Sequence, residues 1–421
     1  MYAGQSKETL SSEKARVSQV YQDYLARNLN LNMSRGMPGQ DQLDLSEGLL
    51  TVVSSSEECF TSSGDARNYG LLEGLPEAKA LMACFLDVSP DDVIVGGSSS
   101  LNLMYDTISR GVNHGFCGHA PWGGQKVKII CPSPGYDRHF GITQHFGIDM
   151  APVAMGPGGP DMDAVEELVL DPAVKGMWCV PKYSNPTGII FSDDTVRRIA
   201  NLKPSAPDFK VLWDNAYAVH GLYGDEPPLL NITREAKTAG NPEMIIQFAS
   251  TSKVTFPGGG ISVVAAGPRT LTDIKESMFY RTICSDKINQ LRHVRFLRDM
   301  EGVRRHMRRH AALLRPKFEA VEEILTRELK GLAQWTTPRG GYFVSLDVVP
   351  GTAKRTVSLM KQAGVVMTAA GATWPYGRDP EDKNIRIAPT CPPLSELRLS
   401  MELLCVCAKL AALETLTQKN P

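Results

Sequence analysis

The sequence predicts an α/β protein with a large, mostly parallel sheet domain and a smaller α+β domain. Short runs rich in Val and Ile alternate with helix-like segments through the middle of the chain, as buried parallel strands joined by crossover helices do. Polar side chains follow five of these runs. The 421 residues are also far more than a typical domain of about 150 residues, so we expect more than one domain.

Composition excludes several classes of protein. Lys and Arg total 45 and Asp and Glu total 46, a net charge of −1 that gives no strong field for nucleic acid or anionic lipid. The 9 cysteines form no Cys-x-x-Cys pair and are typical of reduced thiols. The first residues lack the apolar core of a signal peptide, and no segment approaches the roughly 20 apolar residues of a membrane span. We expect a cytoplasmic protein without nucleic-acid or membrane partners.

The large domain is predicted from its strands. The predicted strands cover residues 93–95, 127–131, 177–180, 211–213, 245–248 and 261–266. Helical patterns at 162–170 and 194–202 lie between some of them, and the Gly- and Pro-rich stretch 156–160 is short enough to be a surface turn.

A different pattern begins near residue 288. An Arg-rich pattern predicts one long connecting helix, whose arginines at 304, 305, 308 and 309 we expect on a solvated face. Strand-like pieces at 342–346, 365–368 and 385–387 and a closing helix over 395–415 predict the smaller domain, which a helix over 12–28 joins. We therefore expect an N-terminal arm (1–45), a large domain (46–295) and a connecting helix with the small domain (296–421).

Residues capable of chemistry stand at the carboxyl ends of the predicted strands. They are Gly96 to Ser100, Pro134 to Tyr136, Asn185-Pro186, Asp214 to Tyr217 and Ser250 to Lys253. Ligands bind at this edge of open α/β sheets, so the five segments indicate one shared crevice.

The segment Gly96 to Ser100 suits a phosphate. A helical pattern over 101–108 follows it, so backbone N–H groups and the hydroxyls of Ser99 and Ser100 gather at a helix N-terminus. The alternative is a plain turn with a serine N-cap. Neither the Walker A pattern nor Gly-x-Gly-x-x-Gly is present.

Lys253 and Asp214 are the other two candidates. Burial at a strand end lowers the pKa of a lysine and suits it to form an imine; the alternative is a surface lysine. Asp214 follows a buried run directly, where a carboxylate is costly unless a protonated ring nitrogen or a similar group pairs with it. The alternative is an aspartate that caps the next turn.

A phosphate cradle, an imine-forming lysine and a carboxylate for a ring nitrogen are together what pyridoxal phosphate requires of a protein. Tyr136 can stack on its ring, and Asn185 and Tyr217 can donate hydrogen bonds to its phenolic oxygen. The sequence therefore predicts a pyridoxal-phosphate enzyme without a metal. His306 and His310 have metal-ligand spacing on a helix but no acidic or thiol partner nearby.

The segments 184–188, 214–217 and 250–253, in this order, resemble the fold-type I pyridoxal-phosphate-dependent aminotransferases. The longer segments 96–106, 134–140, 178–188, 289–296 and 385–390 are similar to the type Ic aspartate aminotransferases, a divergent bacterial subgroup, and span nearly the whole chain. The resemblance implies a seven-stranded type of sheet domain, an S-shaped pair of domains and a homodimer with shared active sites.

The resemblance also implies roles for single residues. Lys253 matches the Schiff-base lysine and proton shuttle, Asp214 the partner of the pyridinium, and Tyr136 the stacking ring. Asn185 and Tyr217 match the partners of the phenolic oxygen, and Tyr69 the tyrosine that reaches the neighbouring subunit's phosphate. The matching phosphate ligands are Ser99, Ser100, Ser250 and Ser252. Arg386, with Asn185 beside it, matches the arginine that binds the substrate α-carboxylate.

Three positions depart from the pattern. Ile261 stands where the common aminotransferase pattern has a phosphate-binding arginine, Ser98 stands where the subgroup has an asparagine, and the loop 34–39 lacks the usual Pro-Ser ending. A substrate side-chain carboxylate would need a further cation. The candidates are Arg35, Arg138, Lys182, Arg281 and Lys287.

The resemblance implies transfer of an amino group from L-aspartate or L-glutamate to a 2-oxo acid such as 2-oxoglutarate, by a ping-pong mechanism. One alternative is another enzyme of the same fold, such as a lyase or a biosynthetic enzyme for an unusual amino acid. A DNA-binding regulator with an aminotransferase-like domain is a further alternative, but it would need a helix-turn-helix domain that the residues before Leu43 do not provide.

Overall fold

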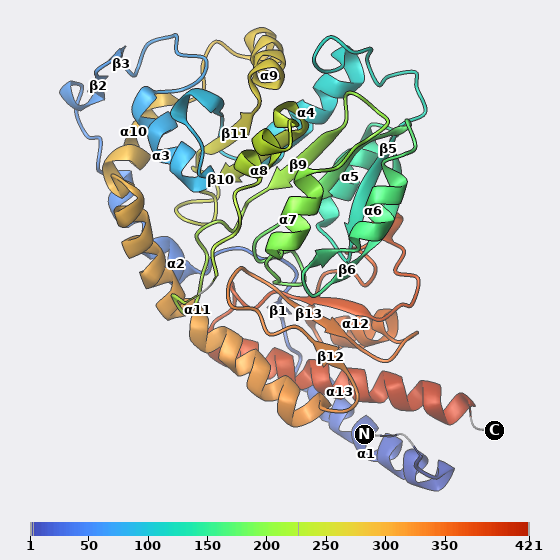
Figure 1. Ribbon diagram of the computed structural model, residues 1–421. Helices are drawn as coiled ribbons and strands as arrows, with labels where there is room; N and C mark the ends of the chain where they lie inside the picture. The colour runs from blue at the N-terminus through green and yellow to red at the C-terminus, as the bar shows by residue number, and fades with distance from the viewer. Residues whose placement is uncertain (1, 3, 226, 420–421) are drawn as a thin grey trace.

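An eight-stranded sheet forms the centre of the larger part of the molecule (Figure 1). The computed structural model describes residue 2 and residues 4–225 and 227–419. In spatial order the strands are β4 (Val93–Val95), β11 (Ser262–Ala266), β10 (Ile245–Ser250), β9 (Lys210–Asp214), β8 (Val174–Cys179), β5 (Lys128–Ser133), β6 (Asp149–Gly156) and β7 (Gly159–Pro160). Strands β10, β9, β8, β5 and β6 run parallel, whereas β11 and β7 are antiparallel to their neighbours.

All six predicted strands of this domain lie in the sheet, but the sequence prediction missed β6. Strand β6 lies near the sheet edge, contains Pro152 and alternates between buried and exposed residues, so it lacks the continuous apolar run of a central strand. The predicted turn at 156–160 contains β7, which pairs back onto the end of β6.

Helices cover both faces of the sheet (Figure 1). On one face, α4 (Ser100–His114), α5 (Asp137–His145) and α9 (Pro268–Arg281) pack on strand residues such as Ile94, Ile246 and Phe248. On the other face, α6 (Met162–Leu168), α7 (Asp193–Ala200) and α8 (Ile232–Thr238) pack on Met177, Val211 and their neighbours. Because successive strand residues point to opposite faces, the central strands are apolar on both sides.

The prediction of a single long connecting helix is wrong. Two helices occupy this part of the chain: α10 (Lys287–Leu297) and α11 (Met300–Leu329). Arg298 adopts a φ of 68°, which ends α10, and the side chain of Asp299 caps α11 by accepting a hydrogen bond from the N–H of Gly302 at 2.8 Å. The four arginines expected on a solvated face of α11 are exposed. Helix α3 (Pro76–Leu86) packs beside α10 and the edge of the sheet.

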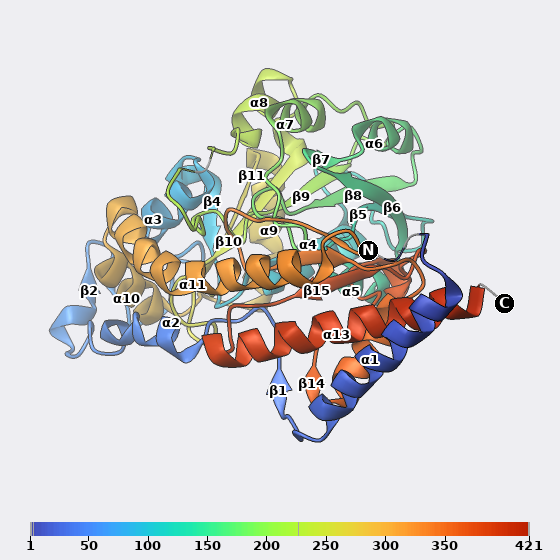
Figure 2. The same ribbon diagram turned by 90° about the horizontal axis from the view of Figure 1, so that it is seen from below.

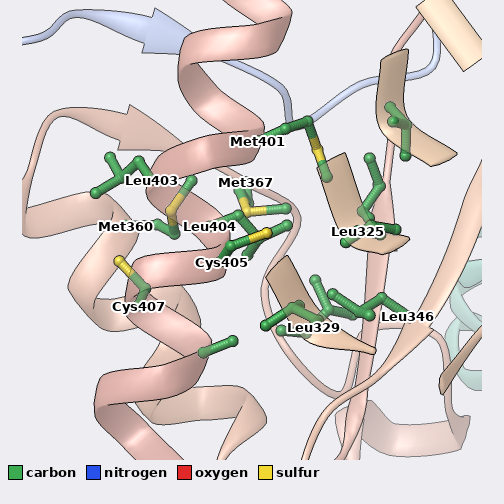
Figure 3. Close-up of a cluster of buried hydrophobic side chains, with 14 of the residues drawn as sticks. Leu325, Leu329, Leu346, Met360, Met367, Met401, Leu403, Leu404, Cys405 and Cys407 are labelled. Atoms are coloured by element: carbon green, nitrogen blue, oxygen red, sulfur yellow. The ribbon is translucent and has the colours of Figure 1, made fainter. Parts of the chain in front are cut away.

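The smaller part of the molecule contains the sheet β12 (Gln334–Trp335), β13 (Val344–Asp347) and β15 (Asn384–Ile387), with α12 (Ala353–Gln362) and α13 (Leu394–Lys419). The N-terminal helix α1 (Lys7–Leu25) crosses α13, and β1 (Leu31–Asn32) pairs with β14 (Val365–Val366), as Figure 2 shows. Figure 3 shows part of the shared core, including Leu325 of α11, Leu346 of β13 and Leu404 of α13. The N-terminal segment therefore packs against α13 and β14 of the smaller part of the molecule.

Short elements complete the described chain. They are α2 (Gln40–Asp44), the hairpin strands β2 (Phe60–Thr61) and β3 (Gly64–Asp65), and the 3-10 segments Glu47–Leu50, Glu57–Cys59, Pro90–Asp92, Pro242–Met244 and Pro375–Gly377. The domain boundaries at residues 45 and 295 stay predictions, and the outer bounds at residues 1 and 421 lie outside the described residues. None of the described helices has the length and apolar character needed to cross a membrane. All 9 cysteines are free thiols.

Candidate active site

The ends of four strands that run in the same direction bring the predicted residues together. Strand β9 ends at Asp214, β10 leads into Lys253, β4 leads into Ser99 and Ser100, and β5 leads into Tyr136. Asp214 lies beside Phe248 in the parallel ladder of β9 and β10, which fixes its position relative to the segment that carries Lys253. The sheet thus places a lysine, a carboxylate and several hydroxyls at one edge.

Lys253 lies against aromatic rings. Its Nζ lies 4.7 Å from the ring centroid of Tyr217 and 5.9 Å from that of Tyr342. Burial lowers the pKa of Lys253, the negative charge of Asp214 opposes that shift, and the positive charge of Arg386 adds to it. A lysine with a lowered pKa carries a larger fraction of the neutral amine, which is the nucleophilic form.

Asp214 is buried and has a partner on one oxygen only. His139 Nε2 lies 3.1 Å from its Oδ2, and the imidazole of His139 stacks on Trp178 with centroids 4.2 Å apart. The other oxygen, Oδ1, is buried without a hydrogen-bond partner among the described residues. Because an unpaired buried carboxylate oxygen is costly, Oδ1 is suited to receive a cationic N–H from a ligand.

His139 is a site residue that the sequence prediction missed. It lies three residues after Tyr136 on α5, and its ring also contacts the Tyr136 ring edge-on at 4.9 Å. Its place one helical turn from a residue in the predicted crevice is the signal that could have identified it.

Two serine-rich turns meet beside Lys253. Ser252 Oγ donates to the carbonyl of Ser98 at 3.0 Å, and Ser250 Oγ donates to Ser252 Oγ at 3.1 Å. Ser99 is the N-cap of α4 and accepts from the N–H of Leu101 at 3.1 Å, and Ser100 is the first residue of that helix. The predicted N-cap and the predicted anion site therefore occupy the same turn.

Position 261, where the common aminotransferase pattern has an arginine, lies in the apolar core. Ile261 is buried in the core below the serine turns, and its N–H donates to Thr251 Oγ1 at 2.9 Å. Gly260 lies between the two turns, where an added Cβ would approach the carbonyl oxygen of Ser98 to 3.1 Å. Asn289 of α10 holds this loop by donating to the carbonyls of Gly259 and Gly260.

Arg386 reaches the same edge from the small domain. Its Nη1 donates to Asp137 Oδ1 at 2.9 Å and to Asn185 Oδ1 at 3.2 Å, and its Nη2 donates to Thr368 Oγ1 at 3.3 Å. The guanidinium also lies over the ring of Phe343 at 4.9 Å. Arg386 and Asn185 are both buried, so the site lies between the two domains.

Other predicted residues lie outside this group. Tyr69 is 79% exposed, and Arg35 and Arg138 are exposed. Arg281 pairs with Asp106, and Lys182 Nζ donates to the carbonyl of Ala218 at 3.0 Å. The buried Lys287 donates to the carbonyls of Asn68 and Gly70, so its charge holds a loop. The role of Arg35 in substrate binding stays a prediction.

A buried polar network supports the backbone of Lys253. Tyr342 Oη and His220 Nε2 both lie 3.3 Å from its carbonyl oxygen. Burial lowers the pKa of His220 to about 3, so the ring is neutral and donates through Nε2. His306 and His310 bond to each other at 3.1 Å, and within the described ranges they belong to no cluster that could hold a metal ion.

These residues fit pyridoxal phosphate. The unpartnered Oδ1 of Asp214 suits its pyridinium N–H, Lys253 suits an imine with its aldehyde, and the two serine turns suit its phosphate. Tyr136 and Tyr217 supply aromatic and phenolic groups next to that space, and burial raises the pKa of both hydroxyls, which therefore stay protonated donors.

Comparisons with known proteins agree with this chemistry. The model of the aspartate amino-transferase family matches residues 5–420. An aspartate aminotransferase of Corynebacterium glutamicum is 45% identical over 408 residues, which cover 94% of this chain and 93% of that protein. The crystal structure of an aspartate transaminase from Corynebacterium glutamicum, 44% identical, superimposes with a TM-score of 0.94 over 97% of each chain.

A more distant structure shares the fold. The α-aminoadipate aminotransferase LysN of Thermus thermophilus, complexed with N-(5′-phosphopyridoxyl)-L-leucine, is 20% identical, with a TM-score of 0.75 over 94% of this chain and 95% of that one. The family match over nearly the whole chain and the high identity of its relatives confirm the resemblance seen in the sequence. The chain belongs to the aspartate amino-transferase family and is an aminotransferase that uses pyridoxal phosphate.

Proposed function

We propose that this enzyme transfers the amino group of L-aspartate or L-glutamate to a 2-oxo acid such as 2-oxoglutarate, by a ping-pong mechanism. The observation that carries the proposal is the joint placement of Lys253, Asp214 and Arg386 at one buried edge between the domains. The relative named aspartate aminotransferase, 45% identical, supports an acidic amino acid as the donor.

Single residues receive roles within this proposal. Lys253 binds the cofactor aldehyde, and Asp214 Oδ1 accepts the pyridinium N–H while His139 holds Oδ2. Tyr136 stacks on the ring, and Asn185 and Tyr217 donate to the phenolic oxygen. Four serines bind the phosphate: Ser99, Ser100, Ser250 and Ser252.

Bound pyridoxal phosphate supplies the electron sink that stabilises negative charge at the substrate Cα. Arg386 binds the substrate α-carboxylate and so holds the substrate beside Lys253. With the cofactor bound, Lys253 would hold its aldehyde and would serve as the base that takes up and returns the substrate Cα proton. Asp214 keeps the ring nitrogen protonated throughout, since its negative charge stabilises the pyridinium.

We infer that the enzyme acts as a homodimer in the cytoplasm, with Tyr69 reaching the phosphate of the neighbouring subunit. Tyr69 is 79% exposed, and three further apolar side chains on the surface, Phe279, Tyr280 and Ile283, are 69%, 89% and 61% exposed. A second copy that covers them would bury large aromatic surfaces. The 9 free cysteines are consistent with a reducing compartment.

Absorption spectroscopy of the purified holoenzyme tests the proposal. We expect a visible cofactor band that L-aspartate or L-glutamate, added alone, converts to the pyridoxamine form with one equivalent of oxo acid. Lys253→Ala should lose this half-reaction. A band that neither amino acid changes would contradict the proposed donors and favour another chemistry on the same fold, such as a lyase.

A further inference from the structure

The guanidinium of Arg386 has a specific set of occupied donors. Nη1 donates hydrogen bonds to Asp137 and to Asn185, and Nη2 donates one to Thr368. Nε is buried and has no partner in the described chain. An arginine has five N–H donors, so these bonds leave one on Nε and one on Nη2, two nitrogens of the guanidinium that can bind a carboxylate together.

Asp137 is the charged member of this set. It is the first residue of α5, where the helix dipole stabilises an anion, and its side chain is 34% exposed while that of Arg386 is 7% exposed. Its carboxylate oxygen accepts a hydrogen bond of 2.9 Å, which fixes both the place and the rotation of the guanidinium. The neutral acceptors Asn185 and Thr368 hold it at longer distances of 3.2 and 3.3 Å.

We propose that Asp137 is a positioning residue for Arg386: it keeps Nη1 occupied, so that the Nε–Nη2 edge receives the carboxylate shared by every substrate. This inference rests on the proposed role of Arg386 in binding the α-carboxylate. Asp137 itself touches no reacting atom and stays bound to Nη1 when the substrate enters.

Two physical consequences separate this role from others. An orienting hydrogen bond depends on an acceptor at the Asp137 position and much less on its charge, so asparagine should replace it. Because the α-carboxylate is common to all substrates, a loss of orientation should weaken each of them by the same factor and should act on KM rather than on kcat. A carboxylate that merely competed with the substrate would have the opposite effect, since its removal would tighten binding.

The test uses the holoenzyme and two amino acids without a Cα hydrogen, 2-methylaspartate and 2-methylalanine, which bind but cannot turn over. Their dissociation constants are measured from the absorbance of the bound cofactor and by calorimetry. We expect Asp137→Ala to raise both constants about tenfold and Asp137→Asn to restore them to within about threefold of the wild-type values. With L-aspartate as substrate, Asp137→Ala should raise KM and leave kcat within about twofold.

Controls make the result specific. Asp193→Ala removes the equivalent first-turn carboxylate of α7, which pairs with Arg197 at 3.4 Å, and should leave both constants unchanged. Arg386→Gln should abolish binding of both amino acids. If the Asp137→Ala variant does not bind the cofactor, the Asp137→Ser variant takes its place, and its dissociation constants are compared with those of Asp137→Asn.

Three results would overturn the proposal. They are an equal loss of amino-acid affinity in Asp137→Ala and Asp137→Asn, tighter binding of the amino acids by Asp137→Ala, or a loss of affinity for 2-methylaspartate alone. The binding measurements need no turnover, so they remain decisive if the enzyme does not transaminate aspartate or glutamate. Failure of the proposed function would appear in the wild-type half-reaction, and failure of the Asp137 inference only in the variants.

Discussion

The two carboxylate oxygens of Asp214 have different surroundings, and the difference has a chemical reason. Oδ2 is held by His139, whereas Oδ1 is left without a protein partner. A carboxylate with both oxygens satisfied by the protein would gain little from a pyridinium, and one with neither held would rotate. The stacking of His139 on Trp178 keeps the imidazole in place, and Trp178 in turn donates to Thr143 at 2.9 Å.

His139→Phe should therefore weaken catalysis while it preserves the stack. The phenyl ring can lie on Trp178, but Oδ2 of Asp214 loses its hydrogen bond, so the carboxylate holds the pyridinium less firmly. We expect kcat to fall about tenfold and the dissociation constant of the cofactor to rise, both measured on the purified enzyme. His145→Phe, on the same helix but exposed, is the control. Unchanged kcat and cofactor affinity in His139→Phe would show that Asp214 needs no second partner.

At the level of elements, the central strands were predictable because burial on both faces produces continuous apolar runs, as in β9 and β10. The site residues that follow these strands were predictable too, because the carboxyl ends of parallel strands lie at one edge of the sheet. Strand β6 and the break between α10 and α11 were not predictable, because they depend on the position at the sheet edge and on the cap at Asp299. His139 was missed because its function arises from a contact with a residue 75 positions away.

The break between α10 and α11 also makes Gly302 necessary. A Cβ on Gly302 would collide with the carbonyl oxygen of Leu297, the last residue of α10. We expect Gly302→Ala to lower the free energy of unfolding by roughly 2 kcal/mol or more, because backbone atoms must move. Gly141→Ala in α5 is the matched control: nothing lies within 4 Å of its Cβ position, so it should be neutral or raise stability by up to about 1 kcal/mol. Equal values in urea unfolding of the two variants would contradict this account.

On the scale of the whole molecule, the Tyr69 loop connects the proposed dimer to the active site. Lys287 Nζ donates to the carbonyls of Asn68 and Gly70, on either side of Tyr69, and two residues further along α10 Asn289 holds the loop after Lys253. One turn of α10 therefore supports both the segment around Tyr69, which we propose reaches the neighbouring subunit, and the loop that follows Lys253.

Lys287→Met should remove the hydrogen bonds that hold the segment around Tyr69. Without the ammonium, the carbonyls of Asn68 and Gly70 lose their donor, so we expect faster hydrogen exchange at residues 68–71 and an approximately tenfold higher dissociation constant for the cofactor. Lys275→Met, which removes a half-exposed partner of Glu73 in the same region, should change neither. Faster exchange with unchanged cofactor affinity would count against the role of Tyr69 in the neighbouring site.

The buried histidines make the stability of the whole fold depend on pH. His293 donates through Nδ1 to the carbonyl of Asn289 at 2.8 Å, and its Nε2 lies 2.9 Å from Thr255 Oγ1, from which it can accept a hydrogen bond when the ring is neutral. Burial lowers its pKa to about 4. The imidazole of His293 is protonated below about pH 6.5 in the unfolded chain but only below about pH 4 in the native state. Stability should therefore fall as the pH decreases through this window.

The contribution of His293 can be measured by urea unfolding of the cofactor-saturated enzyme at pH 7 and pH 5. The difference between native and unfolded pKa corresponds to about 2 kcal/mol of lost stability over these two pH units from this group alone. His293→Gln keeps a donor and an acceptor but cannot titrate, so the loss between pH 7 and pH 5 should be about 2 kcal/mol smaller in this variant. His119→Gln, at an exposed position, should show the wild-type loss. If the loss is the same in His293→Gln as in the wild type, His293 is protonated in the native state at pH 5, and its bonds to Thr255 and Asn289 do not require the neutral ring.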